Sequence, residues 1–238
     1  MLKEKLGLNF DFHQASAPLI GLDISSSAVK MVELAETGKG AYRLERYVIE
    51  PLPKDAVTDG NISNLEATAE TVKRAYKKLG SRFKNVAMAL PVAMVITKKI
   101  VLPADQREEE MEIQVEAEAN QYIPFAMDEV NLDFQIIGPA PSGADEVEVL
   151  IAASRKEKVE DRVAVADAAG LKTVIMDVDS YATLEAFGLI APQLPANGRD
   201  QNIAIVDIGA HMMHFYVIRN GQQLFSRAQQ SIPGGVNS

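Results

Sequence analysis

The sequence predicts an α/β protein built on mixed sheets, and three observations indicate this class. Short apolar runs with alternating patterns, typical of strands, are joined by tight turns near the start of the chain. Segments whose apolar residues have helical spacing follow, placed between further runs of this kind. One strand–turn–strand design also occurs twice, once near each end of the chain.

Composition excludes several classes of protein. The 238 residues include no Cys and three His, which excludes a disulfide framework, a thiol nucleophile and a His-rich metal centre. The net charge of −9 argues against a nucleic-acid binder, which usually carries a basic surface. No apolar run reaches the ~20 residues of a membrane span, and the N-terminus lacks the apolar core of a secretory signal. We therefore expect a soluble cytoplasmic protein.

The first elements follow from local patterns. Residues 1–17 are a tail in which Leu2, Leu6 and Phe10 have roughly helical spacing. Two interpretations of this tail are open, a frayed end or a short amphipathic anchor for a membrane or partner. Behind it, alternation and tight turns predict a three-stranded meander with strands at 19–24, 29–34 and 42–49.

Along the rest of the sequence, segments with the helical spacing of apolar residues alternate with segments that have the two-residue alternation of strands. The run Ser63-Asn64-Leu65-Glu66 has the pattern of a capping box, and Gly80 ends the helix expected behind it at 65–79. Further helices are expected at 105–121, 155–169 and 180–189. Further strands are expected at 84–90, 93–102, 130–137, 146–153 and 171–178, and, after a linker rich in helix breakers, at 203–208, 212–218 and 224–228.

The expected helix at 105–121 is unusually acidic. Acidic side chains in a first turn complement the helix dipole, but seven exceed what capping needs. A solvated face and a docking face for a basic partner are both open. The acidic residues are Asp105, Glu108, Glu109, Glu110, Glu112, Glu116 and Glu118, and the apolar stripe is Met111, Val115, Ala119 and Tyr122.

The repeated design is an apolar strand that ends in Asp and enters a tight turn of small residues. It occurs at 19–27, with Asp23, and at 203–210, with Asp207. A carboxylate at a sheet edge can hold hydrated Mg²⁺, and free backbone N–H groups in the turn can point at phosphate oxygens. A single Asp at a strand end also suits a turn cap, so it is the repetition that favours a clamp for a triphosphate.

These hairpins resemble the two phosphate motifs of the actin-like ATPase fold, which has two ribonuclease H-like lobes. Residues 177–188 resemble the connecting segment of that fold. Residues 21–30, 120–125 and 206–210 together resemble the PilM family, the actin-like, FtsA-related cytoplasmic proteins of type IV pilus assembly. The resemblance runs from about residue 18 to residue 230.

The resemblance implies a division of the chain into subdomains. The second lobe would be incomplete, without the later strands that hold adenine in relatives. The expected parts are a tail (1–17), the first part of subdomain 1A (18–91), an FtsA-type inserted subdomain 1C (92–153), the second part of 1A (154–198) and the start of subdomain 2A (199–238).

The resemblance also implies the site residues. Asp23 and Asp207 would hold Mg²⁺ through water, and Asp179 would orient an attacking water, with support of the helix N-terminus as the other interpretation of Asp179. The segment Tyr122, Ile123, Pro124 and Phe125 would contact a partner, or would belong to the core of subdomain 1C. The phosphates of ATP would contact Ser25, Ser26, Ser27, Lys30, Gly209 and Ala210 as well as the two Asp residues.

The implied function is that of a scaffold in the inner-membrane alignment complex of the type IV pilus, supporting pilus biogenesis and twitching motility. Such a protein binds ATP with at most weak turnover and lies peripheral to the inner membrane, with indirect membrane contact. It grips the N-terminal cytoplasmic segment of PilN between 1A and 1C and so joins PilN–PilO–PilP, with pilus motor or regulatory proteins as further partners and no nucleic acid. A sugar- or acetate-kinase-like phosphotransferase and a filament-forming actin relative are the alternatives.

Overall fold

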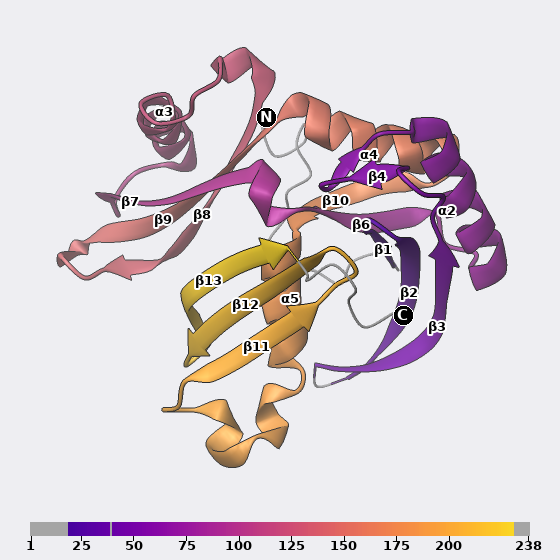
Figure 1. Cartoon of the computed structure of the whole chain (residues 1–238). Helices are drawn as coiled ribbons and strands as arrows, with labels where there is room; N and C mark the ends of the chain where they lie inside the picture. The colour runs from indigo at the N-terminus through magenta and orange to yellow at the C-terminus, as the bar shows by residue number, and fades with distance from the viewer. Residues whose placement is uncertain (1–18, 39, 231–238) are drawn as a thin grey trace.

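The computed structural model describes residues 19–38 and 40–230 (Figure 1). The expected tail at 1–17 and the last residues of the expected 2A part therefore lie outside the described residues. A five-stranded sheet with the order β10-β6-β1-β2-β3 forms the centre of the fold. Its strands are β1 (Ile20–Ile24), β2 (Ala28–Gly38), β3 (Ala41–Pro51), β6 (Asn85–Leu90) and β10 (Lys172–Val178).

This sheet is mixed, as the sequence predicts. Strands β1, β2 and β3 form the antiparallel meander, while β6 runs parallel to both β1 and β10. Parallel neighbours need a crossover, and α2 (Leu65–Leu79) and α4 (Lys156–Ala168) lie in the two connections. Both helices pack on the sheet through apolar side chains and bury the main core. Because β6 and β10 are parallel, their carboxyl ends, Leu90 and Val178, lie at one edge.

Helix α2 has the predicted bounds but a different cap. The N-cap is Asn64, whose Oδ1 accepts the N–H of Ala67 at 3.0 Å. The capping-box pattern had Ser63 in this role, and the helix begins one residue too late for Ser63 to reach the free N–H groups. A short pair of strands that the patterns do not predict, β4 (Val57–Thr58) and β5 (Asn61–Ile62), precedes the helix.

A second sheet, with the order β7-β9-β8, is antiparallel throughout. Helix α3 packs on it through Met111, Val115 and Ala119, which confirms the predicted stripe. The boundaries of the proposed subdomain 1C stay a prediction. The elements are η1 (Val92–Met94), β7 (Val95–Pro103), α3 (Glu108–Ala119), η2 (Met127–Glu129), β8 (Val130–Ala140) and β9 (Gly143–Arg155).

Three expected element starts in this part were wrong, and one of them is that of β9, which begins at Gly143 rather than at residue 146. The turn η1 occupies Val92–Met94, so the strand begins at Val95 rather than at residue 93. The acidic helix begins at Glu108, and Asp105 lies outside it. The reason is local: the carboxylate of Glu110 accepts the backbone N–H of Arg107 and pairs with its guanidinium, which sets the helix start there. The hydrogen bond from the Arg107 side chain lowers the pKa of Glu110.

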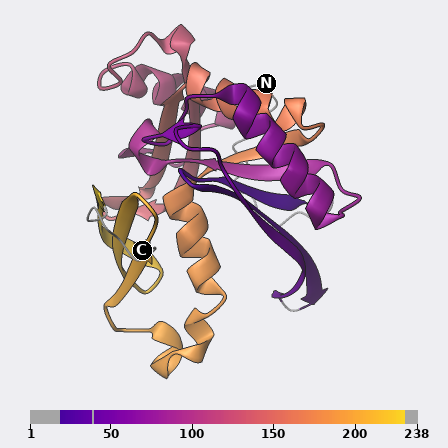
Figure 2. The same cartoon turned by 45° about the vertical axis from the view of Figure 1, so that its right-hand side comes forward.

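The last part of the chain forms a third sheet with the order β11-β12-β13. Figures 1 and 2 show this sheet beside α5 (Asp179–Gly188), below the five-stranded sheet. The turn at Asn220 and Gly221 joins its last two strands, as predicted. None of the helices within 19–38 and 40–230 is long and apolar enough to cross a bilayer. The strands are β11 (Ile203–Ile208), β12 (Met212–Arg219) and β13 (Gln222–Gln230), after the short turns η3 (Ala191–Gln193) and η4 (Pro195–Gly198).

Candidate functional site

The first repeated hairpin is the connection between β1 and β2. Asp23 lies directly opposite Lys30, and the Lys30 ammonium is 3.1 Å from the Asp23 carboxylate. The N–H of Ser25 donates to the carbonyl of Ala28 at 3.1 Å and closes the turn, and the Ser25 hydroxyl donates to the same carbonyl. The predicted contacts Ser25, Ser26 and Ser27 therefore all lie in this turn, with the Ser25 hydroxyl already engaged.

The second hairpin, between β11 and β12, repeats this geometry residue by residue. Asp207 lies directly opposite His214, and the N–H of Gly209 donates to the carbonyl of Met212 at 2.9 Å. A Cβ at Gly209 would stand only 2.8 Å from that carbonyl oxygen, so the turn requires glycine. The predicted residues Gly209 and Ala210 form its tip.

The two turns face each other. The hydroxyl of Ser26 and Nδ1 of His211 are 2.8 Å apart and form a hydrogen bond between the hairpins. Asp179, the first residue of α5, approaches the same place, and its carboxylate accepts the N–H of Val92 at 2.9 Å. Burial raises the pKa of Asp179; the Val92 N–H and the nearby His214 oppose this, and the charge of Asp23 adds to it.

Arg162 and Tyr216 belong to this site and do not stand out in the sequence. Arg162, on α4, is 2% exposed and donates to the carbonyls of Ala89 and Gly60 at 3.1 and 3.0 Å. Burial lowers its pKa, while the charges of Asp23 and Asp179 raise it. Arg162 sits on the apolar stripe of its helix, three residues after Val159, and a cation in such a position is the signal that could have identified it.

The raised pKa of Tyr216 shows that the carboxylates of Asp179 and Asp207 lie near its hydroxyl. It is buried on β12, and burial together with the charges of Asp179 and Asp207 raises its pKa to about 12. Carboxylates from β1, α5 and β11 therefore surround one region.

The donor set fits a phosphate group with a hydrated Mg²⁺. Mg²⁺ usually binds through one or two carboxylates, several waters and phosphate oxygens. Within residues 19–38 and 40–230, no group of three or more His, Asp or Glu residues could hold a metal ion by itself. Mg²⁺ at Asp23 and Asp207 would therefore depend on water and phosphate oxygens for its remaining ligands.

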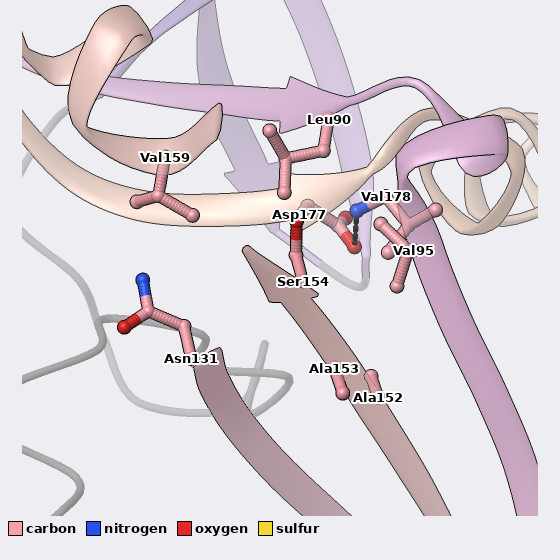
Figure 3. A pocket seen from close by; sticks show the side chains of 9 residues that line it. All are labelled: Leu90, Val95, Asn131, Ala152, Ala153, Ser154, Val159, Asp177 and Val178. Atoms are coloured by element: carbon pink, nitrogen blue, oxygen red, sulfur yellow. Dashed lines mark hydrogen bonds between the residues drawn. The ribbon is translucent and has the colours of Figure 1, made fainter. Parts of the chain in front are cut away.

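A narrow hollow lies between the five-stranded sheet and the β7-β9-β8 sheet (Figure 3). Its walls are mostly apolar, with polar side chains from Asn131, Ser154 and Asp177. The Asp177 carboxylate accepts the N–H of Val178, and burial raises the pKa of Asp177. The hollow is lined by Leu90, Val95, Asn131, Ala152, Ala153, Ser154, Val159, Asp177 and Val178.

A second hollow adjoins the first, since both share Ala153 and Ser154. It is lined by Ile123 and Phe125 of the predicted partner segment, together with Met94, Ile96 and Val130. We call the two hollows together the intersheet groove.

The four predicted partner residues differ in exposure. Ile123 is 6% exposed and packs in the core, whereas Pro124 is exposed. Tyr122 and Phe125 are half-buried, and each ring lies 4.0 Å from a cation, Lys98 and Arg155 respectively. Phe125 and Pro124 are therefore the members of the segment best placed for contact.

The mixed sheets and the paired hairpins define the chain as a protein of the actin-like ATPase fold. The family model described as type IV pilus assembly protein PilM matches residues 21–236, and the chain belongs to this family. It is similar to a solved PilM-PilN type IV pilus biogenesis complex, with 29% identity and a TM-score of 0.75 over 89% of the chain, and it spans 61% of that chain's length. The cytoplasmic domain of EpsL, an inner-membrane component of the Vibrio cholerae type II secretion system, shares the fold at 9% identity and a TM-score of 0.50, over 90% of this chain and 71% of the other.

Proposed function

We propose that this chain is a scaffold of type IV pilus assembly that grips the N-terminal cytoplasmic segment of PilN in the intersheet groove. Membership of the PilM family and the likeness to a PilM-PilN complex support this role. The observation that carries it is the pair of adjoining hollows, the first of which has walls from two separate sheets. Both hollows are small, so the PilN segment would lie across their mouths and direct apolar side chains into them.

The lining suits a peptide with apolar side chains. Apolar walls bury such side chains, and a few polar groups fix the orientation of the bound segment. The amide of Asn131 and the carboxyl of Asp177 line the first hollow and can bond to backbone groups of the peptide. In the second hollow, Phe125 offers a half-buried aromatic ring.

A bulky residue in the groove tests this proposal. Val95→Trp fills the first hollow, and we expect it to weaken binding of a synthetic PilN N-terminal peptide by at least about tenfold, a loss of about 1.4 kcal/mol. Val101→Trp is the matched control, because Val101 lies on the same strand and is 46% exposed. Calorimetric titration measures both. Absence of peptide binding to the folded wild-type chain, or an equal loss in the control, contradicts the proposal.

We further propose that the facing hairpins bind the phosphates of ATP with Mg²⁺. Backbone N–H groups of the two turns, the Lys30 ammonium and the small residues Gly209 and Ala210 would contact the phosphates, and Asp23 and Asp207 would hold the metal through water. Arg162 lies behind Asp23 and Asp179, whose charges raise the pKa of Arg162 against the lowering effect of burial. Asp179 is held by the Val92 N–H, which suits orienting a water in at most a weak ATPase.

Removal of one carboxylate tests the nucleotide proposal. We expect Asp207→Asn to weaken Mg-ATP binding by about tenfold or more, because a metal ligand in water-mediated contact loses its charge. Asp145→Asn is the control, since Asp145 is exposed on β9 outside the hairpins. Titration with a fluorescent ATP analogue measures both variants. Unchanged affinity of Asp207→Asn in the presence of Mg²⁺ contradicts the assignment.

The cellular role follows from the partner. Through PilN the chain would join the PilN–PilO–PilP complex, in the cytoplasm at the inner membrane, and would support pilus biogenesis and twitching motility. In this proposal the five-stranded sheet is the centre of subdomain 1A, and the β7-β9-β8 sheet with α3 is subdomain 1C.

A further inference from the structure

The turns of the two facing hairpins correspond residue by residue. In each turn, the N–H two positions after the Asp of that hairpin donates to the carbonyl five positions after the Asp. The correspondence continues on the return strands, where the residue seven positions after the Asp lies directly opposite it. His211, four positions after Asp207, therefore occupies the place that Ser27 has after Asp23.

The two turns offer different side chains to a phosphate. The first contains three hydroxyls, those of Ser25, Ser26 and Ser27, whereas the second contains none. The side chains of the second turn, from residue 209 to residue 212, are those of glycine, alanine, histidine and methionine. Histidine alone among these four has a side-chain N–H that can donate to a phosphate oxygen. A side-chain contact from the second turn to a phosphate therefore has to come from His211.

The imidazole of His211 is turned toward the first hairpin. Its Nδ1 lies 2.8 Å from the hydroxyl of Ser26, at the point where the two turns meet. The hydrogen bond made by one ring nitrogen sets which nitrogen of a neutral imidazole carries the proton. When the Ser26 hydroxyl donates to Nδ1, the proton lies on Nε2, and the exposed His211 presents this N–H as a donor.

The neighbouring basic side chains face carboxylates. The Lys30 ammonium is 3.1 Å from the carboxylate of Asp23. His214, which corresponds to Lys30 in the repeated geometry, lies directly opposite Asp207. His211, in contrast, is bonded to a neutral hydroxyl. Hydrogen bonds to an ionised acceptor are roughly twice as strong as neutral ones, so an N–H donor in this position suits an anionic ligand such as phosphate.

We propose that His211 binds a phosphate of the nucleotide through its Nε2–H, and that the Ser26 hydroxyl positions the imidazole for this contact. The inference rests on the proposed binding of ATP by the facing hairpins. Ser26 then acts through His211, because its hydroxyl holds Nδ1, while its backbone N–H remains among those of the turn. The second hairpin thereby supplies a side-chain contact to the phosphates, as Lys30 does in the first.

Titration of variants with a fluorescent ATP analogue in the presence of Mg²⁺ tests this assignment. His211→Phe keeps a planar ring but has no donor, and we expect it to bind at least about tenfold more weakly. His211→Gln keeps an N–H donor at similar reach and should stay within about threefold of the wild type. Ser26→Ala removes only the positioning bond, so we expect a loss of about threefold. Thermal unfolding of each variant checks that it is folded.

A matched control and a spectroscopic measurement complete the test. Ser142→Ala, exposed in the turn between β8 and β9, should leave the affinity unchanged. Nitrogen NMR at mildly alkaline pH, where histidine side chains are neutral, should show the Nε2–H tautomer of His211 in the wild type and a mixture of tautomers in Ser26→Ala.

The outcomes separate this inference from the nucleotide proposal. Unchanged affinity of His211→Phe, an Nδ1–H tautomer of His211 in the wild type, or an equal loss in Ser142→Ala and Ser26→Ala overturns the inference and leaves the nucleotide proposal in place. Failure of the folded wild-type chain to bind Mg-ATP contradicts the nucleotide proposal itself, and the role of His211 with it.

Discussion

Two charged residues, Glu50 and Arg162, make contacts that join separate segments of the chain. Glu50 on β3 is nearly buried and receives Lys78 and Arg74 from α2, so one carboxylate joins the edge of the sheet to its covering helix. Arg162 is more deeply buried and donates to two backbone carbonyls from separate segments. Breaking a buried arrangement of this kind usually costs more than a surface ion pair contributes.

Glu50 should make stability depend on pH. The hydrogen bond from Lys78 lowers the pKa of Glu50 below its ordinary value, against an opposing effect of burial. A lowered folded-state pKa stabilises the fold above the unfolded-state pKa, and this contribution is lost as pH falls through the folded-state value. We expect Glu50→Gln to lower the melting temperature at neutral pH and to have little effect in strong acid. Scanning calorimetry at several pH values measures this, and an equal deficit at all pH values contradicts it.

The boundaries of α2 and α3 depend on side chains next to the helix ends. Periodicity alone places the middle of each helix, because apolar residues must face the sheet. The first residue depends on which side chain reaches the free N–H groups, and neighbouring candidates such as Ser63 and Asn64 compete. Patterns therefore predict both helices but miss the cap of α2 and the start of α3.

Replacement of the α2 cap tests this directly. We expect Asn64→Ala to lower the free energy of unfolding by about 1 kcal/mol, because the N–H of Ala67 loses its acceptor. Ser63→Ala is the matched control and should change stability by no more than about 0.5 kcal/mol, the usual range for surface substitutions. Urea unfolding followed by circular dichroism measures both. A larger effect in Ser63→Ala would restore the capping-box interpretation.

On the scale of the whole molecule, the described residues form three main sheets that meet near Asp179. The β11-β12-β13 sheet follows α5, and the Ser26–His211 hydrogen bond links it to the five-stranded sheet. A single exposed hydrogen bond across such a junction stabilises the arrangement only modestly, typically by ~1 kcal/mol. Relative motion of these parts is therefore expected to depend on it.

Loss of the Ser26–His211 hydrogen bond should destabilise the β11-β12-β13 sheet but not the five-stranded sheet. We expect His211→Ala to speed hydrogen exchange of β11 and β12 about fivefold while exchange in β1 and β6 stays unchanged, since ~1 kcal/mol is lost locally. Ser27→Ala is the control, because Ser27 is exposed in the same turn. Mass spectrometry of exchanged peptides measures the effect. Faster exchange in all sheets would indicate global destabilisation instead.

Only those residues of the candidate site that belong to a local sequence pattern could be predicted from the sequence. Asp23 and Asp207 were predicted because a strand that ends in Asp before a small-residue turn can be seen within a few residues, and seen twice. His211 and Tyr216 were missed because their partners lie far away in sequence.

The order of the main elements, the duplicated hairpins and the family can be predicted from the chain alone, because periodicity, turn residues and motifs act over short distances along it. Three features could be found only in the folded molecule: the two hairpins face each other, Arg162 lies buried behind Asp23, and a hollow lies between two sheets. The fold also places Lys172 and Lys84, far apart in sequence, side by side. The physical reason is that packing and charge interactions depend on distance in space, and parallel strand pairing brings together residues that no local pattern connects.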